Sequence, residues 1–131
     1  MLKPKAIDHI ALKVTDMDAA VRFYHDIVGL ELIRPINKSE HGGRSAVVGA
    51  GSQRIDLFER PDFVSSDKDK PIGMDHVCLV VEAGPAEEVI DYLKSEGVEV
   101  FWAPVVRHGH TSVYVYDPDG VHVELQLAER S

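Results

Sequence analysis

The chain has 131 residues, of which 44% are apolar and 27% are charged, and this length and composition are typical of one soluble domain. The net charge of −8 argues against nucleic acid as a partner, because a phosphate backbone binds to basic surfaces. No stretch approaches the roughly 18–20 apolar residues of a membrane span, so no membrane association is expected. The single cysteine, Cys78, excludes an intrachain disulfide, and without an apolar leader the chain is expected to be cytoplasmic.

The chain repeats itself. Residues 7–12 (IDHIAL) recur as residues 74–79 (MDHVCL), and each run is expected to form a strand. Apolar residues at helical spacing then predict a helix over 17–28, with Thr15 and Asp18 as a capping pair and Gly29 as its end.

The second half repeats the helix and then the strands. Pro85 suits the first helical position, and Gly97 ends the predicted helix. The strands that follow are expected to match in pairs at an offset of 68 without gaps: 30–33 with 98–101, 45–48 with 113–116, and the strand around 54–58 with the strand around 121–125. The predicted fold class is therefore α+β, with two βαβββ modules.

One domain is expected over residues 1–131, with module one over about 5–62, a linker over about 63–72 and module two over about 73–128. The linker is polar and charged, which is typical of a surface segment. Neither half has enough residues to be stable alone, so the two should pack together or against a second chain.

Four side chains that bind metals occupy equivalent positions of the repeat. His9 matches His76, and Asp56 matches Glu124. One such histidine is more often structural, and the polar face of the strand around Glu124 could simply be solvated. The coincidence of all four favours a site for a divalent ion such as Fe, Co, Ni, Mn or Zn.

These residues resemble a known family along essentially the whole chain. The resemblance rests on His9, His76, Phe23-Tyr24 with Gly29-Leu30, and Asp117-Pro118-Asp119-Gly120 before Glu124. This pattern is similar to that of the vicinal oxygen chelate superfamily, which includes glyoxalase I, methylmalonyl-CoA epimerase, extradiol dioxygenases, fosfomycin-resistance transferases and bleomycin-binding proteins. The resemblance implies that the modules curl into a half-barrel mixed sheet around a cleft, and that the chain forms a homodimer.

The resemblance also implies one divalent metal ion per site, held by His9, Asp56, His76 and Glu124, with Glu124 as the general base. The position of Asp56 normally holds Glu in glyoxalase I. Because Asp is one methylene shorter, His9, His76 and Glu124 could act instead as a two-histidine, one-carboxylate triad for Fe(II).

Three functions stay open: a metal-dependent glyoxalase-like lyase or isomerase for a small substrate with adjacent oxygens, an Fe(II) extradiol-type dioxygenase, and a metal-free protein that binds small molecules or drugs. Candidate residues of the substrate cleft are Lys13, Arg60, Trp102, Tyr114 and His122. Lys13 and Arg60 leave an anionic substrate plausible. Trp102 is expected in a loop, as are His41, Arg44, Arg107, His108 and His110, which could belong to a mobile lid or be solvated loop charges. Cys78 is expected to be a buried, inert thiol.

Overall fold

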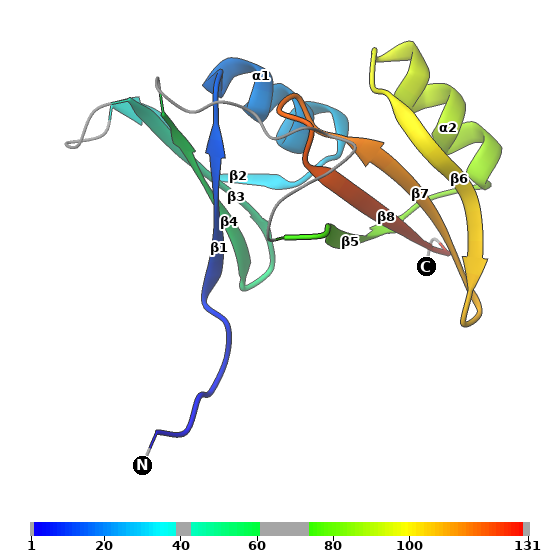
Figure 1. Ribbon diagram of the computed structural model, residues 1–131, viewed down its shortest axis with the longest axis horizontal. Helices are drawn as coiled ribbons and strands as arrows, with labels where there is room; N and C mark the ends of the chain where they lie inside the picture. The colour runs from blue at the N-terminus through cyan, green and yellow to red at the C-terminus, as the bar shows by residue number, and fades with distance from the viewer. Residues whose placement is uncertain (1, 39–42, 61–73, 130–131) are drawn as a thin grey trace. The chain divides into compact units, whose positions relative to one another are not determined.

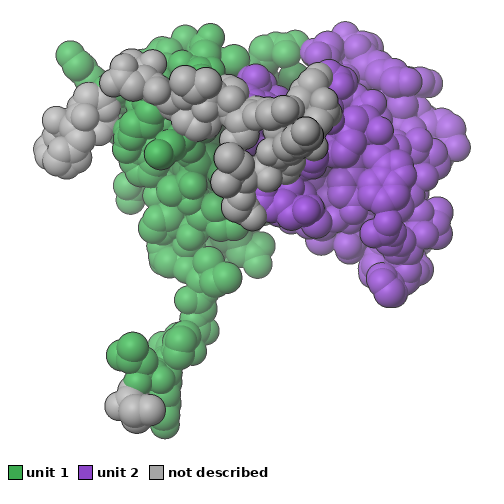
Figure 2. Space-filling view, viewed as in Figure 1, with its two compact units in different colours: residues 1–64 green, residues 65–131 purple. Residues whose placement is uncertain are grey.

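The computed structural model describes residues 2–38, 43–60 and 74–129. The chain divides into two compact units, residues 1–64 and residues 65–131 (Figures 1 and 2). Each unit has a strand, a helical segment and three further strands, so the predicted α+β pair of βαβββ modules is confirmed. The predicted linker and His41 lie outside the described residues. Within the described part of the chain, no helix is long and apolar enough to cross a membrane.

Unit 1 has one four-stranded sheet in the order β1-β4-β3-β2 (Figure 1). Its strands are β1 (His9–Val14), β2 (Glu31–Lys38), β3 (Arg44–Ala50) and β4 (Gln53–Glu59). β1 runs parallel to β4, and the other pairs are antiparallel. Leu12 and Leu57 are buried on one face. His9 and Asp56 lie on the other, because successive side chains of a strand alternate between faces.

The predicted helix over 17–28 has two parts in the structure. An α-helix, α1 (Met17–Val21), continues directly into a π-helical segment, η1 (Arg22–Ile27). The cap is Asp16 rather than Thr15, and its carboxylate accepts a hydrogen bond from the backbone N–H of Ala19 at 3.3 Å. The wider π turn places Phe23 and Tyr24 in the core.

Unit 2 repeats this plan with the sheet order β5-β8-β7-β6 (Figure 1). Its elements are β5 (Val77–Glu82), α2 (Ala86–Ser95), β6 (Val100–Arg107), β7 (His110–Tyr116) and β8 (His122–Ala128). Pro85 stands at the N-cap, one position before the predicted one, and Gly97 follows the helix with a φ of 80°. Leu93 is the residue of α2 that is fully buried.

β6 is longer than the predicted strand 98–101. The strand continues through Trp102 to Arg107, with irregular pairing to β7 between Val100 and Val105. Arg107 therefore ends a strand and His110 begins the next, and only His108 and Gly109 form the turn between them. The placement of Trp102, Arg107 and His110 in loops was wrong, because bulges let β6 continue past residues that do not alternate. Arg44, also expected in a loop, begins β3 instead.

The strand pairing also shows that equivalent residues of the two units are not all separated by the 68 residues of the sequence alignment. Val47 pairs with Asp56, and Tyr114 pairs with Glu124. β3 and β7 are therefore equivalent at an offset of 67 rather than 68, and one extra residue lies in the turn before β8. A shift by one residue moves a side chain to the opposite face of a sheet. This shift places Tyr114 on the face that carries Glu124.

Candidate functional site

Unit 1 holds one histidine–carboxylate pair on the polar face of its sheet. His9 begins β1, and Asp56 lies in the adjacent β4, where it pairs with Ala11. The His9 Nε2 and Asp56 Oδ2 atoms are 3.5 Å apart, and the Asp56 side chain is only 16% exposed. The second oxygen, Oδ1, is buried and has no hydrogen-bond partner among the described residues.

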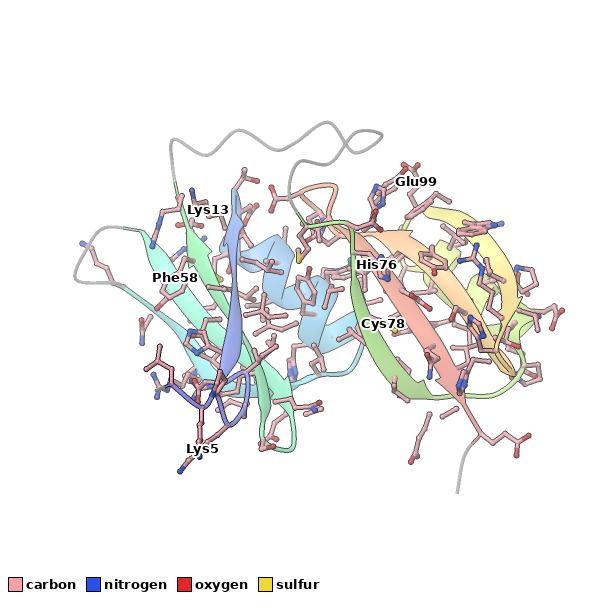
Figure 3. All side chains as sticks on the ribbon, turned by 60° about the horizontal axis from the view of Figure 1, so that its bottom comes forward. Lys5, Lys13, Phe58, His76, Cys78 and Glu99 are labelled. Carbon is pink, nitrogen blue, oxygen red and sulfur yellow. The ribbon has the colours of Figure 1, made fainter. Side chains whose placement is uncertain are left out.

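Unit 2 holds the equivalent pair. His76 directly precedes β5, and Glu124 lies in the middle of β8, where it pairs with Cys78. The His76 Nε2 and Glu124 Oε1 atoms are 3.0 Å apart. Figure 3 labels Cys78 on β5 and His76 just before this strand.

An aspartate that directly precedes each histidine binds its other ring nitrogen. Asp8 lies 2.7 Å from His9 Nδ1, and Asp75 lies 2.7 Å from His76 Nδ1. The hydrogen bond with the neighbouring histidine is the main reason that the pKa of each aspartate lies below its ordinary value. Sequence reasoning did not assign these roles, although the repeated Asp-His dipeptide was a signal for them.

Glu124 is surrounded by hydrogen-bond donors. The Ser112 hydroxyl donates to Glu124 Oε2 at 2.8 Å, and Tyr114 and Cys78 also bond to this carboxylate. Burial opposes ionisation of Glu124, but the donors and the nearby His76 outweigh it, so its pKa is lowered. The carboxylate is therefore held in a fixed position and is ionised at neutral pH. Ser112 is a further residue that sequence reasoning missed.

Among the described residues, Asp56 lacks the hydrogen-bond donors that surround Glu124, because the residues at the equivalent positions have different side chains. Ala11 and Val47 stand beside Asp56 where Cys78 and Tyr114 stand beside Glu124. Ser45, which is equivalent to Ser112, donates instead to Asn37 Oδ1 at 2.9 Å. The two pairs are thus alike in position but differ in their surroundings.

Cys78 does not have the properties of a nucleophile. Burial, followed by the charge of Glu124, raises the pKa of its thiol, which keeps the sulfur protonated at neutral pH. Cys78 is exposed overall, so the predicted burial was wrong, but the raised pKa is consistent with the prediction of an inert thiol.

A hollow of about 250 Å³ opens beside the pair in unit 2. Among the residues that line it are His76, Glu124, Ser112, Tyr114 and Arg107. Tyr114 was one of the predicted cleft residues, and burial is the main reason that its pKa is raised.

The other predicted cleft residues lie around the two pairs. Trp102 stacks on Tyr114 with ring centroids 5.0 Å apart, and His122 lies against Phe101 rather than in the lining of the hollow. In unit 1, Lys13 is exposed and pairs with Phe58, and the guanidinium of Arg60 lies 4.9 Å above the Phe58 ring.

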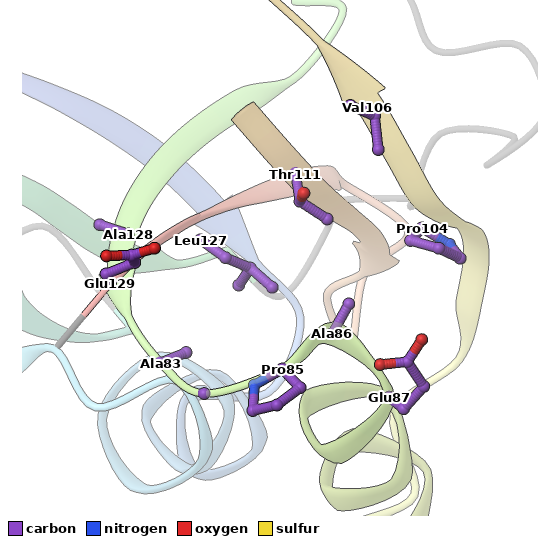
Figure 4. A pocket seen from close by; sticks show the side chains of 11 residues that line it. Ala83, Pro85, Ala86, Glu87, Pro104, Val106, Thr111, Leu127, Ala128 and Glu129 are labelled. Atoms are coloured by element: carbon purple, nitrogen blue, oxygen red, sulfur yellow. The ribbon is translucent and has the colours of Figure 1, made fainter. Parts of the chain in front are cut away.

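A larger hollow of about 660 Å³ lies elsewhere in unit 2, between the start of α2 and strands β6, β7 and β8 (Figure 4). Pro85, Val106 and Leu127 contribute apolar walls. Among the described residues, its charged side chains are Glu87 and Glu129, and no histidine, lysine or arginine of that set lines it. The predicted site residues of unit 2, His76 and Glu124, line the smaller hollow instead.

Each unit holds one of the two predicted histidine–carboxylate pairs, His9 with Asp56 and His76 with Glu124. In the described ranges, no group of three or more His, Cys, Asp or Glu side chains is arranged to hold a metal ion. The four-ligand site of His9, Asp56, His76 and Glu124 stays a prediction.

Comparisons with known proteins agree with the two repeated modules. The model of the Glyoxalase/Bleomycin resistance protein/Dioxygenase superfamily matches residues 6–125. A probable lactoylglutathione lyase from Synechocystis is 31% identical over 121 residues, which cover 89% of this chain and 91% of that protein. The mitochondrial methylmalonyl-CoA epimerase of Bos taurus is 30% identical over 131 residues, which cover 93% of this chain and 74% of the epimerase.

The solved structures agree as well. A crystal structure of a glyoxalase/dioxygenase from Nostoc punctiforme superposes with a TM-score of 0.81 at 26% identity, over 99% of this chain and 97% of that one. The chain therefore belongs to the Glyoxalase/Bleomycin resistance protein/Dioxygenase superfamily, which is the vicinal oxygen chelate family that its sequence resembles.

Proposed function

We propose that the protein is a metal-dependent, glyoxalase-like lyase or isomerase whose small substrate chelates the ion through adjacent oxygens. Relatives named as a lactoylglutathione lyase and as methylmalonyl-CoA epimerases support this class. The same superfamily hosts other activities, so the proposal rests on the chemistry of the site.

One observation carries the proposal: each histidine has a carboxylate on both ring nitrogens. A neutral imidazole has one N–H, so His76 can donate to Asp75, 2.7 Å from Nδ1, or to Glu124, 3.0 Å from Nε2, but not to both. The ring nitrogen without a hydrogen then presents its lone pair to a carboxylate oxygen. Two acceptors this close need a positive charge between them, either a second proton or a metal cation.

The donor set fits a divalent metal ion. Neutral imidazoles with carboxylates suit Fe, Co, Ni, Mn or Zn. The buried Oδ1 of Asp56 has no partner among the described residues, and a cation would satisfy it. We propose His9, Asp56, His76 and Glu124 as the ligands of one ion.

When bound, such an ion would act as a Lewis acid that makes a C–H group beside a coordinated oxygen more acidic. Glu124 is the proposed acceptor of that proton, because it is ionised at neutral pH and lines the hollow. Ser112 and Tyr114 hold its oxygens in place. Asp8 and Asp75 fix the histidine rings with Nε2 directed at the carboxylates.

Elemental analysis tests the metal site, provided that the protein is purified without a chelator or an affinity-nickel step. We expect about one Ni, Co, Zn or Mn per chain, and loss of that metal in His76→Ala and in Glu124→Ala. Glu82→Gln is the matched control, because Glu82 is an exposed carboxylate at the end of β5. Unchanged metal content in both site variants would refute the assignment.

Exchange of a substrate C–H with deuterium tests the reaction. Small 2-oxo and 2-hydroxy acids are incubated in D₂O with the protein in its metal-bound form, and their C–H signals are followed by proton NMR. A lyase or isomerase of this kind should exchange the hydrogen beside the carbonyl of its substrate, and Glu124→Gln should abolish the exchange while the fold persists.

One observation favours an Fe(II) extradiol-type dioxygenase as the second candidate. The His9–Asp56 separation of 3.5 Å exceeds the His76–Glu124 separation of 3.0 Å, which is consistent with a shorter side chain that does not reach the ion. His9, His76 and Glu124 would then bind Fe(II) as a triad with open positions. Asp56→Ala separates the two candidates: retained iron with oxygen uptake on catechols supports the dioxygenase, and lost metal supports the lyase or isomerase.

A protein that takes up no metal even after reconstitution would fit the third hypothesis, a metal-free protein that binds small molecules.

A further inference from the structure

The hollow in unit 2 has an unusual charge for this chain. The whole protein carries a net charge of −8, yet among the described residues that line this hollow Glu124 is the one carboxylate. Arg107, His108 and His110 line the same space together with His76. Arg107, His108 and His110 all come from the hairpin between β6 and β7.

The hairpin between β6 and β7 positions these side chains. Arg107 pairs with His110, which closes a two-residue turn. Both turn residues have positive φ, 51° at His108 and 79° at Gly109, as a tight type I′ hairpin turn requires. The turn therefore holds Arg107 and His110 side by side at the ends of two paired strands.

Arg107 is held by an aromatic stack rather than by an ion pair. Its guanidinium carbon lies 4.7 Å from the centre of the Trp102 ring, and Trp102 stacks on Tyr114 with an interplanar angle of 28°. Tyr114 in turn bonds to Glu124. Among the described residues, no carboxylate lies within ion-pair distance of Arg107.

A guanidinium that rests on a ring keeps its N–H groups available for another acceptor. Planar guanidinium groups bind carboxylates and phosphates through two parallel hydrogen bonds. A hollow of about 250 Å³ is slightly smaller than the roughly 300–1,000 Å³ of typical ligand sites. The arrangement thus suits a small oxyanion, because Arg107 and the proposed proton acceptor Glu124 line the same small hollow.

We infer that the substrate is a small carboxylic acid or phosphate ester whose anionic group binds Arg107 while its reacting carbon lies toward Glu124. This inference rests on the proposed function of Glu124 and His76, and it adds Arg107 as the residue that determines substrate class.

The only tryptophan of the chain, Trp102, reports directly on this site. Its fluorescence is titrated at constant ionic strength with L-lactate, with lactamide as the uncharged counterpart, and with inorganic phosphate. We expect a saturable change with at least one anion and none with lactamide. Arg107→Gln should weaken binding of the anion by about tenfold or more, as the loss of a charge-assisted pair does. The affinity of Arg107→Lys should lie between that of the unaltered protein and that of Arg107→Gln.

Arg34→Gln is the matched control, because Arg34 is an exposed arginine of β2 in the other unit. Binding of lactate alone supports a carboxylic acid, binding of phosphate alone supports a phosphate ester, and binding of both supports an oxyanion site of either source. No saturable change with either anion would overturn the inference. Equal weakening in Arg107→Gln and Arg34→Gln would also overturn it, because that result reflects general charge screening.

Metal content of the same samples separates this inference from the proposed function. Arg107→Gln should keep the metal content of the unaltered protein, since the guanidinium is not a ligand. Anion binding that depends on Arg107 in a protein without metal would refute the proposed function and leave this inference standing. Metal uptake without anion binding would refute this inference alone.

Discussion

At the scale of single residues, the most informative feature is the aspartate that precedes each histidine proposed as a metal ligand, His9 and His76. Asp8 and Asp75 repeat the same 2.7 Å contact to Nδ1 in both units. A carboxylate behind a ligating histidine fixes the tautomer and orientation of the ring. Asp8 has an additional partner, Arg54 Nη2 at 3.0 Å, which Asp75 lacks among the described residues.

Asp75→Asn should therefore lower metal affinity by about tenfold to a hundredfold, the usual effect of removing such a partner. The affinity is measured by competition with a chromophoric chelator. Nitrogen-15 NMR of His76 in the metal-free protein provides an independent readout. Without the Asp75 carboxylate, the distribution of the ring hydrogen between Nδ1 and Nε2 should change. Asp91→Asn, on the exposed face of α2, is the control, and an equal loss of affinity in both variants would contradict the orienting role.

At the scale of secondary-structure elements, Glu59 ties β4 to the start of α1 and to β3. It accepts hydrogen bonds from the Met17 backbone N–H at 2.9 Å and from Arg44 Nη2 at 2.9 Å and Nε at 3.2 Å. The bond with Arg44, followed by that with Met17, lowers the pKa of Glu59 below its ordinary value of 4.5. This carboxylate therefore stabilises the folded state more when it is ionised.

Glu59→Gln should destabilise the protein by about 1 kcal/mol at pH 7, because a charge-assisted hydrogen bond becomes a neutral one. Glu59 has a lowered folded-state pKa, so its stabilisation is fully present above pH 4.5 and is lost as the pH falls through the folded-state value. Urea unfolding at a series of pH values checks both statements. A difference between the two proteins that stays constant down to pH 3 would be inconsistent with this role.

Leu93 anchors α2 on its sheet. It is 2% exposed and is the buried residue of an otherwise half-exposed helix. Leu93→Ala should cost about 2–3 kcal/mol, at the lower end of the range for core leucines. The loss is read from the free energy of unfolding in urea, with Asp91→Ala on the exposed side of the same helix expected to change it by less than about 0.5 kcal/mol.

The sequence predicts these elements well where the pattern is periodic and less well where it is not. The repeated Ile-Asp-His and Met-Asp-His runs and the alternation in β8 identify both modules. The π turn at Arg22–Ile27 keeps a helical pattern of apolar residues, so periodicity cannot distinguish it from an α-helix. β6 was predicted too short because Trp102 to Val105 breaks the alternation at a bulge.

The same physical reason explains what was missed in the candidate site. Spacing identifies His9, Asp56, His76 and Glu124, but it does not show which neighbours reach them across strands. Ser112 and Tyr114 reach Glu124 because β7 is shifted by one residue relative to the gapless alignment. Arg107 reaches Trp102 because both belong to one strand that continues to the hairpin turn.

At the scale of the whole molecule, the repeat constrains the metal stoichiometry. Each unit holds one of the two predicted ligand pairs, so an ion bound by all four predicted ligands needs the pair of unit 1 and the pair of unit 2. The expected content is therefore one ion per chain, whether the pairs come from one chain or from two. We also propose a homodimer, which light scattering after size exclusion should show as twice the chain mass.

Mixing two inactive variants distinguishes sites within a chain from sites shared between chains. One variant carries His9→Ala with Asp56→Ala, and the other carries His76→Ala with Glu124→Ala. Neither should hold metal as a homodimer, because each lacks one pair. If the ligands come from two chains, a heterodimer formed by unfolding and refolding the mixture combines both intact pairs at one site and should bind one ion per dimer. If the ligands come from one chain, every site in the mixture keeps a missing pair, and refolding the mixture should restore no metal.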